Sequence, residues 1–297
     1  MDWIESCTLC PRMCRADRRK RAGFCGMGPD IRAARAAPHL WEEPPISGER
    51  GTGAVFFSGC TLRCVFCQNA DISARGLGRD ITPGQLGDIL LRLQSEGVQT
   101  LSLISPTPYV PLIIEALEGV RSRLAVPVVY NTGGYENIST LRRLEGLIDV
   151  YLPDLKTRSP ELAARYSAAP DYFEAASAAI REMARQTGAP RLSPDGILLR
   201  GTLVRHLVLP GGRRDSIAVL DWLAEAFPKG EVLLSLMSQY TPDFVRGDYP
   251  ELRRRVTSLE YRRVLEHARE LGLTGYCQER SAAGAQYTPD FDLTGIQ

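Results

Sequence analysis

The chain has 297 residues, a formal net charge of +1, 44% hydrophobic residues and 24% charged residues. This composition is ordinary for a globular protein, and near-neutrality leaves no global field to attract nucleic acid or an anionic membrane. The longest apolar runs are too short to span a bilayer, and the acidic start at residues 1–5 does not resemble a signal peptide. We therefore expect a cytoplasmic protein with one large domain plus extensions and no membrane partner.

Residues 1–50 are rich in cysteine and arginine, and the prolines and glycine of 39–48 predict an irregular, loop-rich segment. Thiols that cluster in a chain without export signals favour metal or redox use over disulfides. All-thiolate coordination suits zinc and an auxiliary [4Fe–4S] cluster equally. We therefore predict a metal-binding N-terminal extension over 1–50, whose ligands are Cys7, Cys10, Cys14 and Cys25.

The basic side chains among these thiols predict a solvated basic loop. They are Arg12, Arg15, Arg18, Arg19, Lys20 and Arg21. Aromatic residues for base stacking are not interleaved with them, so nucleic acid is not an expected partner. Cys277 stands alone in the sequence and is predicted to be a buried thiol.

From Ala54 the pattern changes to short apolar runs that alternate with amphipathic stretches. Strands are predicted at 54–57, 100–104, 127–131, 148–152, 203–208 and 232–237. Helices are predicted from Thr82 to Gly97 and at about 110–123, 137–146, 160–167, 171–187, 213–227 and 258–271. Six βα units in series predict an α/β fold with a parallel sheet, either open or curled into a partial barrel. We assign the core to 51–242 and a C-terminal helical segment to 243–297.

Three further cysteines follow the first predicted strand with the spacing C-x3-C-x2-C: Cys60, Cys64 and Cys67. In parallel α/β folds the carboxyl ends of the strands hold the functional site. Three thiolates are one too few for a closed four-ligand site. The triad is therefore either a zinc knuckle completed by a distant ligand or a [4Fe–4S] cluster with one open iron. Phe66, beside the last cysteine, can shield such a cluster.

The triad, its flanking stretch 41–69 and the segment Cys7–Cys14 resemble the radical S-adenosylmethionine (radical SAM) superfamily. Within it the sequence is similar to glycyl radical enzyme activases such as pyruvate formate-lyase activating enzyme, and particularly to the activase-like proteins labelled PflX. The resemblance implies a partial (β/α)6 barrel of the TIM type. It also implies an oxidoreductase that cleaves S-adenosylmethionine reductively at a [4Fe–4S] cluster and then takes hydrogen from a substrate.

The resemblance implies further contacts to the cofactor. Asp154 and Lys156 match the activases' D-L-K segment, where both side chains contact S-adenosylmethionine. Asn131 and Thr132 match the D-T-N-G segment that holds a monovalent cation, although Asn131 lowers the negative charge there. His206 matches a histidine near the ribose.

After the second predicted strand, many superfamily members carry Gly-Gly-Glu-Pro, whereas this chain has no carboxylate there. Ser105 and Thr107 are therefore weaker candidates, which can offer a carbonyl and a hydroxyl to the cofactor's amino group. Residues 239–241, after the sixth strand, are candidates on the substrate side.

The substrate implied by the resemblance is a polypeptide, with a glycine of a partner glycyl radical enzyme as one target. The expected electron donor is of the flavodoxin or ferredoxin type. Radical modification of a peptide, an RNA base or a small molecule is an alternative. The non-enzymatic alternative is a binding protein that uses its metals as structural staples.

Overall fold

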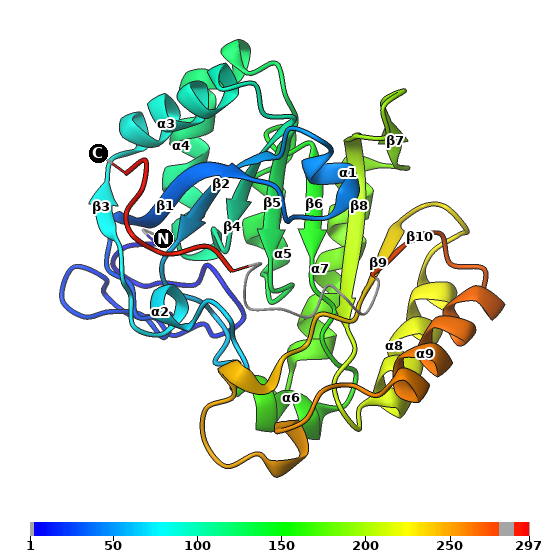
Figure 1. The fold of residues 1–297 in the computed structure, drawn as a ribbon. Helices are drawn as coiled ribbons and strands as arrows, with labels where there is room; N and C mark the ends of the chain where they lie inside the picture. Colours follow the sequence, from blue (N-terminus) through cyan, green and yellow to red (C-terminus); the bar gives the residue numbers. More distant parts are fainter. Residues whose placement is uncertain (1–2, 279–287, 297) are drawn as a thin grey trace.

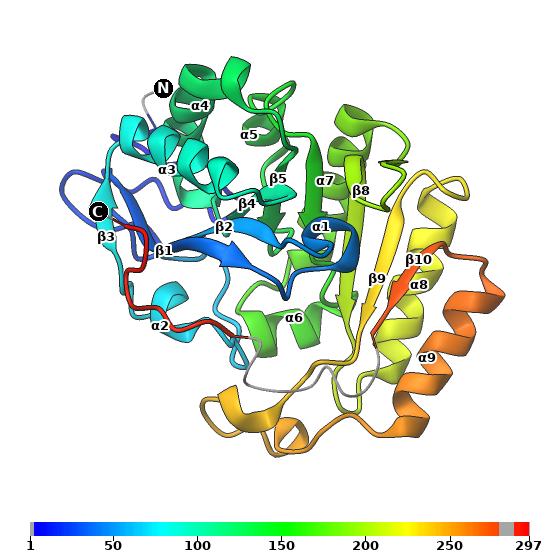
Figure 2. The ribbon, with the colours of Figure 1, turned by 45° about the horizontal axis from the view of Figure 1, so that its top comes forward.

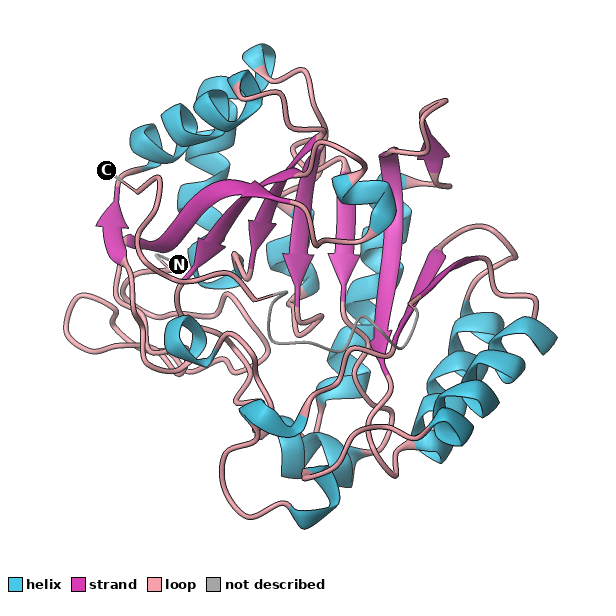
Figure 3. Cartoon of the chain, in the orientation of Figure 1, coloured by secondary structure: helices cyan, strands magenta, loops and turns pink. Residues whose placement is uncertain are grey.

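The computed structural model describes residues 3–278 and 288–296. A twisted sheet runs through the molecule in the order β10-β9-β8-β6-β5-β4-β2-β1-β3 (Figures 1 and 3). Its core strands are all parallel: β2 (Thr52–Phe57), β4 (Thr100–Ile104), β5 (Val128–Thr132), β6 (Val150–Pro153), β8 (Leu198–Leu207) and β9 (Leu233–Met237). The six predicted strands and the partial-barrel α/β fold are confirmed.

The major helices cover the outer face of this sheet (Figure 2). They are α3 (Pro83–Ser95), α4 (Val110–Val120), α5 (Ile138–Arg142), α7 (Tyr172–Thr187), α8 (Arg213–Ala226) and α9 (Ser258–Glu270). Helix α6 (Pro160–Ser167) lies instead beyond the carboxyl ends of the strands (Figure 1). Two short helices lie at opposite ends of the strands. Helix α1 (Pro44–Ser47) lies at the amino end of β4, where the Thr100 hydroxyl donates to the Ile46 carbonyl, and α2 (Ala70–Ser73) follows the loop after β2. Helix α3 begins as predicted, because the Thr82 hydroxyl and the Gln85 side chain form a reciprocal capping box. Helix α5 is shorter than predicted and ends at Arg142.

The prediction of a loop-rich segment over 1–50 is wrong for β1 (Ile31–His39), which pairs antiparallel with β2. A short strand, β3 (Arg79–Ile81), continues the sheet beyond β1. The run of alanines in β1 carries little β propensity, so the local pattern is weak. Pairing with β2 decides the conformation, and Ile31, Ala33 and Ala36 are completely buried.

The C-terminal part is more than a helical segment. Helix α9 packs on α8, but β10 (Gly275–Cys277) adds a parallel strand beside β9. The last described residues return across β1, where the Ala36 amide donates to the Thr294 carbonyl at 2.8 Å and Ile296 is buried. Cys277 is exposed at this sheet edge, so its predicted burial is wrong.

The short strand β7 (Arg191–Leu192) pairs antiparallel with β8. Within the described ranges, the helices are all too short or too polar to cross a bilayer.

Candidate active site

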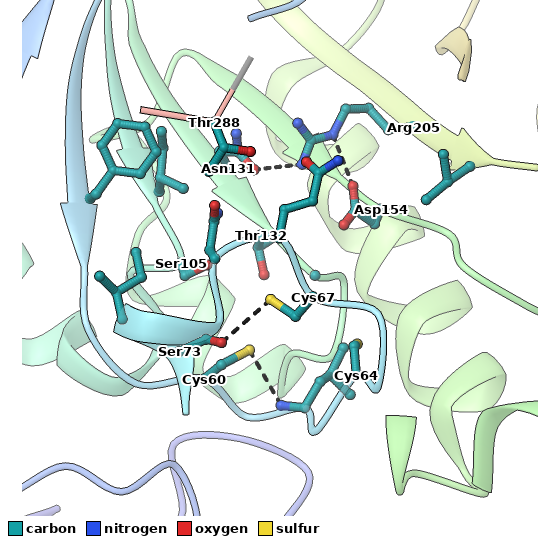
Figure 4. Close-up of a pocket in the computed structure, with 18 of the residues that line it drawn as sticks. Cys60, Cys64, Cys67, Ser73, Ser105, Asn131, Thr132, Asp154, Arg205 and Thr288 are labelled. Atoms are coloured by element: carbon teal, nitrogen blue, oxygen red, sulfur yellow. Dashed lines mark hydrogen bonds and ion pairs between the residues drawn. The ribbon is translucent and has the colours of Figure 1, made fainter. Parts of the chain in front are cut away.

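A cavity of about 240 Å³ opens at the carboxyl ends of the parallel strands (Figure 4). Nine of the predicted site residues line it together: Cys60, Cys64, Phe66, Cys67, Ser105, Asn131, Thr132, Asp154 and Lys156. They come from the loops after β2, β4 and β6 and from the last two residues of β5. The strand order therefore brings together side chains that lie up to about a hundred residues apart in the sequence.

The triad loop begins at Gly59, whose φ of +79° is the left-handed conformation that glycine adopts readily. A Cβ there would lie 2.2 Å from the Met27 Cγ, so glycine is also required by packing. Each thiol has a polar neighbour: the Leu62 amide lies 3.4 Å from the Cys60 Sγ, and serine hydroxyls lie near the other two sulfurs.

Those hydroxyls belong to Ser167, 3.2 Å from the Cys64 Sγ, and to Ser73, 3.4 Å from the Cys67 Sγ. Burial raises the pKa of the Cys60 thiol to about 12 and also raises that of Cys64. Burial therefore favours the neutral thiols. A bound metal centre favours the thiolates instead, because its positive charge stabilises the negatively charged sulfur. Hydrogen bonds to the sulfurs would then tune the reduction potential of the centre.

The wall opposite the triad is an ionic network centred on Arg205, which the sequence analysis did not single out (Figure 4). Its Nε lies 2.8 Å from the Asp154 Oδ1, and its two Nη atoms lie 3.1 Å from the Glu42 Oε1 and 2.7 Å from the Asn131 Oδ1. The Asn131 Nδ2 donates to the Glu42 Oε2 at 2.6 Å. One guanidinium thus holds three acceptors from three segments in fixed positions.

Asp154 is also paired with Lys156, whose Nζ lies 2.5 Å from the Asp154 Oδ2. Although burial opposes ionisation, Arg205 and Lys156 hold the pKa of Asp154 below its usual range. Burial likewise opposes the charge on Lys156, but Asp154 raises its pKa above the usual value. Both groups are therefore charged at neutral pH and present an ammonium and a carboxylate to the cavity.

Two predicted cofactor contacts lie outside the cavity walls. His206 is buried on the other side of β8, with its Nδ1 2.7 Å from the Leu155 carbonyl oxygen. Side chains alternate along a strand, so Arg205 faces the cavity and His206 cannot. Thr107 is buried in a short 3₁₀ turn and donates to Glu136. The alternation rule shows that only one of Arg205 and His206 can face the cavity, but it does not say which one; no local pattern marks Glu42.

Beneath Thr132 lies the buried carboxylate of Glu136, which accepts hydrogen bonds from the Thr132 and Thr107 hydroxyls. Its second oxygen, Oε2, is buried and has no hydrogen-bond partner within 3.5 Å in the part of the chain that the structure describes. Burial raises the pKa of Glu136 to about 7 from its ordinary value of 4.5. Ser105, at the end of β4 above this group, adopts a left-handed φ of 59°, a strained conformation of the kind that concentrates at functional sites.

Glu136→Gln is expected to change the pH dependence of stability. Between pH 4.5 and about 7 the folded protein retains the Glu136 proton that the unfolded chain releases. The free energy of unfolding therefore falls as pH rises through this window, by about 3 kcal/mol from this group. In Glu136→Gln the free energy of unfolding should not decrease over this pH range on account of this group, so the variant should be more stable than the parent at pH 8. Urea unfolding at pH 4.5, 6 and 8 measures it; parallel curves for both proteins would contradict the prediction.

The four N-terminal cysteines do not line the cavity; they lie behind the triad loop, beyond Gly59. Over residues 3–278 and 288–296, no three cysteine, histidine or carboxylate side chains converge on one point as they stand. Side-chain rotation is therefore needed to close a metal site at either group of thiols.

The profile of the radical SAM superfamily matches residues 54–202, just over half of the chain. The chain belongs to the radical SAM superfamily. Uncharacterized protein MJ0674 of Methanocaldococcus jannaschii is 26% identical over 283 residues, which cover 91% of this chain and 76% of that protein.

Two solved structures show the same fold. A radical SAM methyltransferase from Sphaerobacter thermophilus has a TM-score of 0.53 at 15% identity and covers 79% of this chain and 70% of that chain. Streptococcus suis SuiB bound to its precursor peptide SuiA has a TM-score of 0.52 at 17% identity and covers 74% of this chain. The present chain spans 46% of SuiB.

Membership of the radical SAM superfamily implies an enzyme that holds an iron–sulfur cluster and cleaves S-adenosylmethionine reductively. The cavity fits both groups. Cys60, Cys64 and Cys67 provide three soft thiolates at one end, which suits an iron–sulfur cluster with one iron left open. The charged Asp154–Lys156 pair lines the same cavity and suits the zwitterionic methionine part of S-adenosylmethionine.

Proposed function

We propose that this radical SAM protein is an activase-type oxidoreductase that takes hydrogen from a polypeptide, with a glycine Cα of a partner enzyme as the target. The observation that carries the proposal is that three thiols and a charged lysine–aspartate pair line one cavity at the carboxyl ends of the strands. The bound cluster supplies the electron that breaks a carbon–sulfur bond of S-adenosylmethionine. The chain's residues bind and orient the reactants and exclude water.

The ionic wall orients S-adenosylmethionine. The Lys156 ammonium pairs with the methionine carboxylate, and Asp154 accepts from the amino group or a ribose hydroxyl. Arg205 keeps Asp154 ionised and fixed, so the carboxylate needs little reorganisation when the ligand arrives. Asn131, held between Glu42 and Arg205, offers an amide where the activases have an aspartate. A monovalent cation beside Thr132 remains a prediction.

A second hollow of about 160 Å³ adjoins the cavity across Phe66, Lys156 and Leu207. Its lining combines Phe66, Leu162, Leu207 and Leu209 with the polar side chains of Asp215 and Glu251. Flat, weakly hydrated ring systems bind well between apolar and aromatic side chains. We assign this hollow to the adenine ring, which places the rest of S-adenosylmethionine along the ionic wall.

The mouth of the cavity favours a polypeptide substrate. It combines the half-exposed Trp41 with the amide side chains of Gln68 and Gln239, which can pair with a peptide backbone. Among proteins of this fold, SuiB has been seen with a precursor peptide, which supports peptide access to such a cavity. A flavodoxin- or ferredoxin-type protein is the proposed electron donor.

Anaerobic reconstitution followed by dithionite and S-adenosylmethionine tests the first step. We expect 5′-deoxyadenosine and methionine in equal amounts, and a fully loaded protein that releases neither would contradict the proposal. Peptides deuterated at the glycine Cα test the target. Deuterium in the released 5′-deoxyadenosine supports a glycyl target, whereas transfer from a labelled RNA base or small molecule would replace the polypeptide assignment and leave the first step intact.

A further inference from the structure

The four N-terminal cysteines lie near one another in one loop-rich region, although their sulfurs do not converge on a single point as they stand. Cys7 and Cys25 are buried, and Cys10 and Cys14 are half-buried. The thiols of Cys7 and Cys14 share a hydrogen bond. A Cβ at Gly23 would lie 3.4 Å from the Cys25 sulfur and 3.6 Å from the Cys14 sulfur, so this glycine leaves room for two sulfurs side by side.

Backbone amides in this segment point at the sulfurs in a repeating pattern. The sulfurs of Cys7, Cys10 and Cys14 each accept a hydrogen bond from the backbone amide two residues later in the chain. These amides belong to Leu9, Arg12 and Ala16. The same relation joins the Leu62 amide to the Cys60 sulfur in the triad. Amides that donate to sulfur stabilise thiolates, which are the form that binds metal.

The loop also accepts backbone strain next to Cys14. Met13 and Arg15 on either side of it have left-handed φ values of 42° and 49°. Non-glycine residues avoid this region unless the surroundings hold them there. The chain returns to Cys7 at this point, because the Arg15 amide donates to the Cys7 carbonyl at 2.9 Å and the Cys7 amide donates to the Ala16 carbonyl at 3.1 Å.

We infer that Cys7, Cys10, Cys14 and Cys25 bind one divalent metal ion of the zinc type in a closed, all-thiolate site. Zinc–thiolate bonds of about 2.3 Å place tetrahedral sulfurs roughly 3.8 Å apart. The loop is small enough for this, since Cys7 and Cys14 lie on backbone segments that are hydrogen-bonded to each other. All four ligands come from the protein, which is typical of a structural site.

This site is built against the back of the catalytic triad loop. Arg12, between two of the cysteines, donates from Nε to the Thr61 carbonyl at 2.8 Å and from Nη1 to the Ala168 carbonyl at 2.5 Å. Arg63 in the triad loop donates to the Phe24 carbonyl. The Cys25 carbonyl oxygen lies 2.9 Å from where a Gly59 Cβ would stand. The metal ion therefore supports the loop that holds Cys60, and its loss should loosen the triad.

The metal content of the full chain tests the site, with Cys60, Cys64 and Cys67 replaced by alanine so that every bound metal reports on the N-terminal thiols. We expect about one zinc ion per chain, lost in the additional Cys14→Ser or Cys25→Ser variants and retained in Cys277→Ser. Cobalt substitution should give the charge-transfer absorption of thiolate coordination. Iron with sulfide in place of zinc, or zinc that persists without Cys14 and Cys25, would overturn the inference.

Arg12→Met tests the support separately, because it keeps the four thiols and removes the ties to Thr61 and Ala168. In the otherwise unaltered protein it should retain zinc but hold less iron at the triad after reconstitution. Circular dichroism checks that each variant is folded. Iron loading equal to that of the parent would refute the supporting role. Because zinc content is independent of S-adenosylmethionine cleavage, these outcomes are separate from those of the proposed function.

Discussion

Cys64→Ala is expected to reduce 5′-deoxyadenosine formation to the level of cluster-free protein. Its sulfur is one of only three available to the cluster, and two thiolates cannot hold four irons against solvent and reductant. The loss should appear in the iron content after reconstitution as well as in product formation under dithionite.

Cys277→Ser provides the matched control, because Cys277 is exposed on β10 and does not line the cavity. It should retain the iron and the activity of the parent. Product formation by Cys64→Ala at the parent's rate would show that Cys60, Cys64 and Cys67 are not the catalytic ligand set.

Arg205→Ala is expected to destabilise the fold as well as the site. The substitution leaves the carboxylates of Asp154 and Glu42 without their shared partner, and their side chains are only 15% and 10% exposed. Removing one partner of a buried ion pair typically costs about 3–5 kcal/mol. Denaturant unfolding should show a loss of this size, and S-adenosylmethionine should bind more weakly because Asp154 is no longer held in place.

Two further variants separate these effects. Arg205→Lys should recover part of the stability, since one ammonium supplies charge but not the planar fork that reaches three acceptors. Arg262→Ala, at an exposed ion pair on α9, should leave unfolding nearly unchanged. An Arg205→Ala protein as stable as Arg262→Ala would show that the network is solvated and contributes little.

Much of the fold could be predicted because its signals are local. Apolar runs alternate with amphipathic helices from β2 onward, and the capping residues Thr82 and Gln85 mark the start of α3 within four positions. The triad is equally local, since Cys60 to Cys67 lie in one short loop whose spacing alone points to a metal centre.

Contacts between residues far apart in the sequence could not be predicted, and the reason is physical. Arg12 and Arg18 were expected in a solvated basic loop, but Arg12 binds carbonyls of residues 61 and 168, and Arg18 is 2% exposed and donates to the Pro108 carbonyl. Their partners lie from about fifty to more than a hundred and fifty positions away. A sequence pattern that is read over a short run of residues carries no information about contacts between residues this far apart.

The amino-acid sequence by itself determined the thiol triad, the parallel βα series and the membership that both imply, because each depends on residues close together in the chain. The tertiary structure alone decided which face of β8 meets the cavity, and so selected Arg205 over His206. It also decided that Glu42 completes the ionic wall and that the N-terminal thiols stand behind the triad loop. These outcomes depend on strand register and packing, which bring distant residues to one place.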